Sequence, residues 1–153
     1  MSSRRFLNFT PLLLIWFCSL AAAQEWNGFF AKTTLYENIL NVTEVETAIS
    51  GGLTKDFVTQ YPKPEFGLYI LIEEPMIQGK PDSKVAFIML GLSKRSPSGE
   101  LYTPKFTYTT LVDVTGLSAQ DQRSKILAQL KQDAATFAKT ALADSSKIHW
   151  STK

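Results

Sequence analysis

Apolar side chains recur with helical spacing between Ser118 and Ala143, and this stretch organises the rest of the chain. Ser118 can cap the helix with its hydroxyl, and Asp121, three positions on, can return the hydrogen bond as in a capping box. The positions between the apolar residues are mostly Gln and Lys and form a solvated face. Phe137 lies in the middle of the apolar stripe, so we expect its ring to be buried against a sheet. The stripe consists of Ile126, Leu127, Leu130, Ala134, Phe137, Ala138, Ala141 and Leu142.

A second helical pattern covers residues 43–60, and its start has the spacing of a capping box. Gly51 and Gly52 interrupt it. Two adjacent glycines in a helix interior cost about 2 kcal/mol relative to alanines. We therefore expect the helix to bend there, or to end and restart toward Phe57. Two prolines shortly after residue 60 stop the pattern, because the residue before a proline avoids the helical region.

Three segments have the composition and alternation of β-strands: residues 67–72, 85–92 and 106–114. The first two are apolar on both faces. Such strands usually lie in the centre of a sheet or have a partner covering each face. The third alternates apolar residues with threonines, which indicates one wetter face. A Ser-Pro-Ser-Gly turn at residues 96–99 joins the second and third strands into a long hairpin.

The predicted order of elements is α-β-β-β-α. Short links favour antiparallel neighbours, and both helices can lie on one face of the sheet. We therefore predict an α+β fold, a two-layer sandwich with an antiparallel sheet of at least three strands. Residues 24–31 carry three aromatic side chains and are expected to pack on this domain as a short segment. Residues 33–41 have no firm period and are left open between strand and helix.

The N-terminus has the pattern of a secretory signal peptide. Two arginines precede an apolar run over residues 11–20, and an Ala-Ala-Ala sequence follows it. The run is about half of the roughly 20 residues that span a bilayer, so we expect cleavage before Gln24 rather than a retained anchor. The predicted organisation is a cleaved signal peptide, residues 1–23, and a single α+β domain, residues 24–153.

Cys18 is the single cysteine of the chain, and it lies in the predicted signal peptide. The bulky residues before it do not resemble a lipobox, so we expect export by a Sec-type signal and no stable membrane insertion after cleavage. The mature domain would contain no thiol. Animal secreted domains of this size usually carry disulfides, so we infer a bacterial periplasm. Losing both signal arginines lowers the formal charge from +2 to zero, which argues against a nucleic-acid partner.

The inventory of catalytic and metal-binding side chains is thin. His149 is the single histidine, and it lies near the C-terminus, where chains tend to fray. A transition-metal site or a Ser-His-Asp mechanism would depend on this one residue. Glu73 and Glu74 are adjacent at the end of a strand, so their side chains point to opposite faces and cannot act as a pair. We predict no enzymatic activity, no cofactor and no metal site.

Several short motifs resemble the periplasmic curli secretion adaptor (CsgE) family. These are an Asp-Phe pair at 56–57, a strand that ends in Glu-Glu-Pro at 73–75, a glycine a few residues on, two more strands and a closing helix. The resemblance covers residues 45–142. It departs from the family at 74–78, where Glu-Pro-Met-Ile-Gln replaces Arg-Pro-Ser-Ala-Arg, and the hairpin at residue 96 is longer. The resemblance implies contact with a secretion pore or fibre subunit. The partner-binding residues that it implies are Glu73, Glu74, Pro75 and Gly79.

Two interpretations of function follow from these features. The first is a non-enzymatic periplasmic binding protein, an accessory or adaptor in curli-type or other surface-protein secretion and assembly. Its partner would be another envelope or secreted protein, bound at an exposed sheet edge or at residues 75–82, for example by β-augmentation. The alternative is a periplasmic carrier with a small-ligand pocket between helix and sheet. Homo-oligomerisation stays open. The aromatic residues that would line the pocket, or simply fill the core, are Tyr69, Phe87, Phe106, Tyr108 and Phe137.

Overall fold

The computed structural model describes residues 29–32, 39–75, 79 and 82–150. The predicted signal peptide, residues 1–23, and the aromatic segment up to residue 28 lie outside the described residues. The elements in chain order are β1 (Phe29–Lys32), α1 (Val42–Ser50), α2 (Lys55–Gln60), β2 (Phe66–Glu73), β3 (Val85–Lys94), β4 (Phe106–Asp113), α3 (Ala119–Ala143) and a short 3-10 helix, η1 (Ser145–Lys147).

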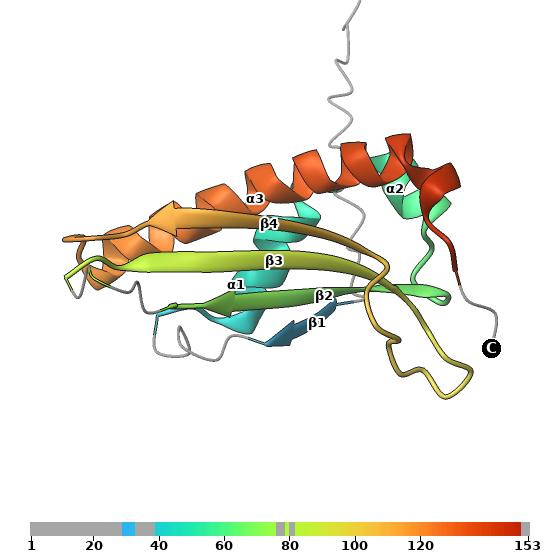
Figure 1. The fold of residues 1–153 in the computed structure, drawn as a ribbon, viewed down its shortest axis with the longest axis horizontal. Coiled ribbons are helices and arrows are strands. Elements are labelled where there is room, and N and C mark those ends of the chain that lie inside the picture. Colours follow the sequence, from blue (N-terminus) through green and yellow to red (C-terminus); the bar gives the residue numbers. More distant parts are fainter. Residues whose placement is uncertain (1–28, 33–38, 76–78, 80–81, 151–153) are drawn as a thin grey trace, which may run out of the picture.

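Four strands form one sheet in the order β1-β2-β3-β4. β2, β3 and β4 are antiparallel neighbours, with Ile70 opposite Leu90 and Leu90 opposite Tyr108. β1 pairs in parallel with β2 at the other side of the sheet. Figure 1 views the sheet from the side opposite the helices, and α1 and α3 lie behind it. The predicted fold class, a two-layer α+β sandwich with its helices on one face, is confirmed.

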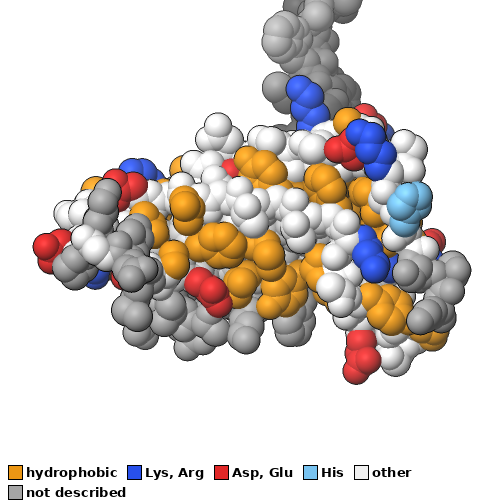
Figure 2. Space-filling view, in the orientation of Figure 1, with side chains coloured by type: hydrophobic (Ala, Val, Ile, Leu, Met, Phe, Trp, Pro, Cys, Tyr) orange, Lys and Arg blue, Asp and Glu red, His pale blue; other side chains and the backbone are white. Residues whose placement is uncertain are grey.

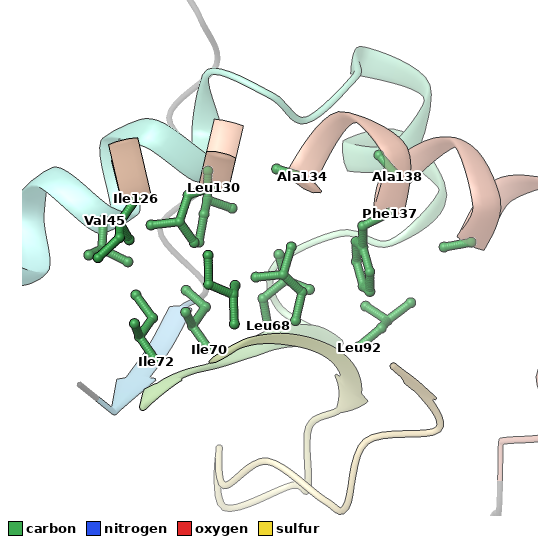
Figure 3. Close-up of a cluster of buried hydrophobic side chains, with 14 of the residues drawn as sticks. Val45, Leu68, Ile70, Ile72, Leu92, Ile126, Leu130, Ala134, Phe137 and Ala138 are labelled. Atoms are coloured by element: carbon green, nitrogen blue, oxygen red, sulfur yellow. The ribbon is translucent and has the colours of Figure 1, made fainter. Parts of the chain in front are cut away.

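The core lies between α3, α1 and the sheet. The stripe of α3 is buried as predicted, with Ile126, Leu130 and Phe137 fully inside. Figure 3 shows these side chains pointing at the strand residues below them, among which Ile70 and Leu92 are also fully buried. The ring of Phe137 has its centroid 5.2 Å from that of Phe106, as expected for a helix residue packed on the third predicted strand. Burial of this continuous apolar surface is the main stabilising term of the domain.

The helix ends follow the local sequence signals. The Ser118 hydroxyl accepts a hydrogen bond from the Asp121 backbone N–H at 3.2 Å and donates to the Asp121 carboxylate at 2.6 Å. The Gly51-Gly52 pair separates α1 from α2, so the helix ends and restarts there. Asn41, not Thr43, caps α1: its side-chain oxygen accepts from the Thr43 N–H at 2.9 Å.

Strand β1 was not predicted. Residues 24–31 were interpreted as a packed aromatic segment, whereas Phe29–Lys32 form a fourth, parallel strand. A four-residue edge strand is too short to show an alternation, and its pairing with β2 depends on contacts distant in sequence. The observed order is therefore the predicted one with one strand added before it.

Two expectations about exposure were wrong. Gln122 was assigned to the solvated face of α3, but it is buried, and its Nε2 donates to the Leu117 carbonyl at 2.9 Å. The C-terminal residues were expected to fray. Instead the ring of Trp150 packs against Phe66 and Tyr61, with centroids 5.0 and 6.3 Å apart. His149 is exposed, as expected.

Candidate functional site: the outer face and the β4 edge of the sheet

Successive strand residues point to opposite sides of a sheet, and here the even-numbered residues of β2, β3 and β4 face the helices. The odd-numbered residues form the opposite surface, which we call the outer face. Phe87 and Met89 in its middle are only half-buried, and Leu111 keeps 65% of its surface exposed. Figure 2 shows hydrophobic side chains gathered over these strands. The outer face consists of Tyr69, Leu71, Glu73, Val85, Phe87, Met89, Gly91, Ser93, Thr107, Thr109, Leu111 and Asp113.

Strand β4 ends the sheet on one side, and among the described residues it pairs with β3 alone. The Val114 backbone N–H donates to the Lys84 carbonyl at 2.9 Å, in register with the ladder. In an antiparallel ladder the bonded residues alternate, so even-numbered residues of β4 bond to β3. The backbone N–H and C=O groups of Thr107, Thr109 and Leu111 therefore point away from β3. They form an open edge on a strand that contains neither proline nor lysine.

The hairpin after β3 closes one end of the outer face. Pro104 lies over Gly91 so closely that a β-carbon there would come within 2.9 Å of its ring. Arg95 fixes the hairpin: its Nε donates to the carbonyls of Lys63 and Phe66, and its Nη1 donates to that of Gly99, each at 3.0 Å. The exposed apolar surface is thus bounded by a rigid ridge at this end.

Charged groups mark the two ends of the outer face differently. Asp113 ends β4 beside the exposed end of β3, whereas Lys105 precedes β4 next to the hairpin. Both are exposed. The hydroxyl and backbone N–H of Thr115 hydrogen-bond the Asp113 carboxylate, the N–H at 2.9 Å, and hold its pKa below the ordinary value. Asp113 is therefore a fixed negative charge at neutral pH.

Three of the residues implied by the family resemblance, Glu73, Glu74 and Pro75, follow one another at the end of β2, and Gly79 is four positions further along the chain. Glu73 is the last residue of β2, opposite Phe87, and both glutamates are half-buried. Pro75 and Gly79 are exposed, and Gly79 has a φ of 78°. Residues 76–78 and 80–81 of the link lie outside the described residues. The partner-binding role of these four residues stays a prediction.

The aromatic residues proposed for a ligand pocket do not line one cavity. Tyr69 and Phe87 lie on the outer face, whereas Phe106, Tyr108 and Phe137 lie between the sheet and α3. The sheet separates the two groups. These residues were chosen by residue type alone, without considering which face of the sheet each strand position points to. The pocket that they would define does not form.

The carboxylate of Asp133 on α3 is buried, with 1% of the residue's surface exposed. Its Oδ1 accepts a hydrogen bond from Gln129 Nε2 at 2.7 Å, and among the described residues its Oδ2 has no partner. Burial raises the pKa of this carboxyl. No group of three His, Cys, Asp or Glu side chains in the described part of the chain is placed to hold a metal ion. The absence of enzymatic activity stays a prediction.

Comparison with known proteins adds no family. No family model matches the chain, and no curated protein matches it. Two solved structures resemble it weakly. A minor lipoprotein from Acinetobacter baumannii is 12% identical, with a TM-score of 0.38, over 78% of this chain and 91% of that one. A protein assigned as a lipoprotein from Caulobacter crescentus CB15 is 13% identical, with a TM-score of 0.29, over 78% and 88%. Similarity this low assigns neither fold nor function to the present chain. Within the described residues, no helix combines the length and apolar character needed to cross a membrane.

The sequence predicted strand β4 and its wetter face, but not that β4 lies at the edge of the sheet, and it did not identify the outer face as a surface. The two-sided apolar patterns of β2 and β3 were interpreted as strands in the centre of a sheet or covered on both faces. Both are central strands, and the described helices cover only one face. The signal was present in β4, where Thr107 and Thr109 alternate with aromatic residues and mark the outer side as solvent-facing.

Proposed function

We propose that this chain is an exported, non-enzymatic protein of the bacterial periplasm that acts by binding another protein. The role would be that of an accessory or adaptor in curli-type or other surface-protein secretion and assembly. Export is supported by the signal-peptide pattern of residues 1–23. The partner would be an envelope or secreted protein, such as a secretion pore or a fibre subunit.

The open edge of β4 is the observation that carries the proposal. Three alternate residues of the eight-residue strand, Thr107, Thr109 and Leu111, direct N–H and C=O groups away from β3, where no strand of the described part of the chain pairs with them. An extended segment of a partner can add to such an edge by main-chain hydrogen bonds. Natural edges of this length are usually protected by proline, lysine or a bulge, which reduces unwanted pairing. β4 has none of these, which favours a strand that is meant to be paired.

The test uses a photoreactive amino acid at Thr107 in the producing cell. The expected result is a covalent adduct with a different envelope protein, identified by mass spectrometry. Thr109→Pro removes one outward N–H at a position where an edge strand tolerates proline. This substitution should abolish the adduct. Thr109→Ala keeps the N–H and should retain it.

Adducts of equal yield in the Thr109→Pro and Thr109→Ala cells would show that the edge is not the contact, and the proposal would fail. A probe on the solvated side of α3, at Ala128, controls for random contact. Export is checked separately by cell fractionation and by the mass of the mature N-terminus, which should begin at Gln24.

A further inference from the structure

The described residues cover the outer face only at its hairpin end, where Pro104 lies over Gly91 and Ser93 is buried, and the centre of the face is apolar. Leu71, Phe87 and Met89 are half-buried on it, and Leu111 is largely exposed. Glu73 lies directly opposite Phe87 and borders this group, and Asp113 lies at the same end of the outer face. Contiguous apolar surfaces of this kind on a soluble domain mark interaction sites.

We infer that the outer face packs against the outer face of a second copy of this chain, forming a two-fold symmetric β-sandwich dimer. The two-fold axis would lie between the sheets, perpendicular to the strands, along the row Leu71–Met89–Thr109. These three residues are cross-strand neighbours. Packed sheets lie about 10 Å apart, and their strands cross at about 30°. The inference concerns the side chains of the outer face, whereas the proposal above concerns the backbone groups at the β4 edge; Thr107, Thr109 and Leu111 belong to both, and the inference does not depend on the partner proposed above.

The pattern of side chains on the outer face is complementary to itself under this operation. A two-fold interface requires that residue i meet residue j and that j meet i. The axis exchanges the row of Phe87 with the row of Gly91, so the Phe87 ring would meet the ring of Pro104, which fills the space over Gly91. Leu111 would meet the smaller Thr107. Apolar groups of one copy therefore face apolar or small groups of the other.

The charges are complementary in the same way. Asp113 lies at one end of the outer face and Lys105 at the other. Antiparallel packing brings the Asp113 carboxylate of each copy toward Lys105 of the other, giving two equivalent pairs. It also keeps the Asp113 carboxylates of the two copies at opposite ends of the interface. Electrostatic complementarity of this kind fixes the register of an interface more than it adds affinity.

The size of the surface sets the expected strength. Three strands of eight residues cover about 26 by 14 Å in the plane of the sheet, which is less than the roughly 800 Å² per partner of a stable interface. We therefore expect a reversible dimer whose fraction rises with concentration. The first experiment is sedimentation velocity of the mature chain over the micromolar range. A monomer at every concentration would overturn the inference.

Met89→Asp places two carboxylates across the axis and should give a monomer at all concentrations. Its control is Val42→Asp on α1, which places the same charge at an apolar residue that keeps 46% of its surface exposed and lies away from the outer face. The control should dimerise like the wild type. Circular dichroism melts of both variants verify folding. A folded Met89→Asp protein that still dimerises would contradict the proposed interface.

A charge-exchange experiment tests the register. Lys105→Glu alone and Asp113→Lys alone each place like charges at both pairs, so each should dimerise more weakly than the wild type. An equimolar mixture of the two variants restores two opposite-charge pairs and should recover dimers that contain one copy of each. No recovery in the mixture of folded variants would overturn the face-to-face arrangement.

Discussion

Gly52 lies against the backbone of α3 so closely that a β-carbon on it would come within 2.2 Å of the Lys131 carbonyl oxygen and 2.8 Å of the Ala134 β-carbon. The link between α1 and α2 therefore touches the helix that carries the core stripe. The second glycine of the pair is required by this contact, not by an unusual backbone angle, because its φ is not in the left-handed region. Its neighbour Gly51 has only ordinary contacts, the nearest at 3.4 Å.

Gly52→Ala should destabilise the domain by about 1 to 3 kcal/mol, because the added methyl forces α3 and the link apart. Gly51→Ala has room at a position with φ of −67° and should change stability by less than about 1 kcal/mol, in the stabilising direction. Urea melts of the two variants measure the difference. Equal midpoints would show that α1 and α3 are not packed as described.

Phe137→Ala should cost about 3 to 5 kcal/mol through lost burial and the cavity that remains. Phe137 is fully buried, and its ring contacts those of Phe57 and Phe106. Lys139→Ala, two positions along on the solvated side of the same helix, should change stability by no more than about 0.5 kcal/mol. Thermal melts of both compare them directly. A small effect at Phe137 would contradict the two-layer core.

Trp150→Ala should destabilise the domain by about 1 to 3 kcal/mol, because the ring packs edge-on against Phe66 and Tyr61. The Tyr61 hydroxyl also donates to the Ala141 carbonyl at 3.1 Å, so Trp150 covers the junction of α2, β2 and α3. Tyr102→Ala, at a ring that is 45% exposed, is the matched aromatic control and should be near neutral. Indistinguishable melts would mean that the C-terminal segment does not dock.

The parts of the fold set by short-range signals were predicted correctly. The helix starting after Ser118, the break at Gly51-Gly52 and the turn at residues 96–99 each depend on a cap, a glycine pair or a proline that acts on its immediate neighbours. In that turn the Gly99 N–H donates to the Ser96 carbonyl at 2.9 Å, and Gly99 has a φ of 89°. Such signals are visible in the sequence because the residues that cause the structure are adjacent.

The features that were missed depend on residues far apart in sequence. β1 needs β2 as a template, and Trp150 needs the aromatic residues of α2 and β2. The outer face could not be seen as uncovered until the number of helices on each side of the sheet was known. Two polar residues of α3, Gln122 and Asp133, are buried beside the apolar stripe. The buried face of the helix is therefore wider than the spacing of its apolar residues indicates. Their burial is decided by the neighbouring layers.

The ion pair between Glu44 of α1 and Arg123 of α3 gives a prediction about acid. Arg123 Nε donates to Glu44 Oε2 at 3.1 Å, and its Nη2 contacts Oε1. The hydrogen bonds from Arg123 lower the pKa of Glu44. Because the pKa of Glu44 is lower in the folded than in the unfolded state, its ionisation stabilises the folded state at pH values above the ordinary pKa. This stabilisation is lost as the pH falls through the pKa of the folded state. Glu44→Gln should therefore lose stability at neutral pH and little at low pH. A deficit that is the same at both pH values would contradict the pair.

Asp133 should have the opposite dependence on pH. Burial raises its pKa above the ordinary value of about 3.9, because the charged form loses water and gains only one hydrogen bond, from Gln129. The folded state then holds the proton more tightly than the unfolded state. The protonated Asp133 carboxyl therefore contributes fully to the stability of the folded state below about pH 4. This contribution is lost as the pH rises through the pKa of Asp133 in the folded state. Ionised at neutral pH, the carboxylate opposes folding.

Asp133→Asn keeps an oxygen for Gln129 and removes the charge. It should be more stable than the wild type at pH 7, and the advantage should shrink as the pH is lowered toward 4. Gln132→Asn, an exposed neighbour on the same helix, is the control and should show no such pH-dependent difference. Urea unfolding of the three proteins across this pH range gives the differences directly. If Asp133→Asn were less stable than the wild type by the same amount at every pH, the carboxyl would titrate normally and would not be buried beneath α3 as described.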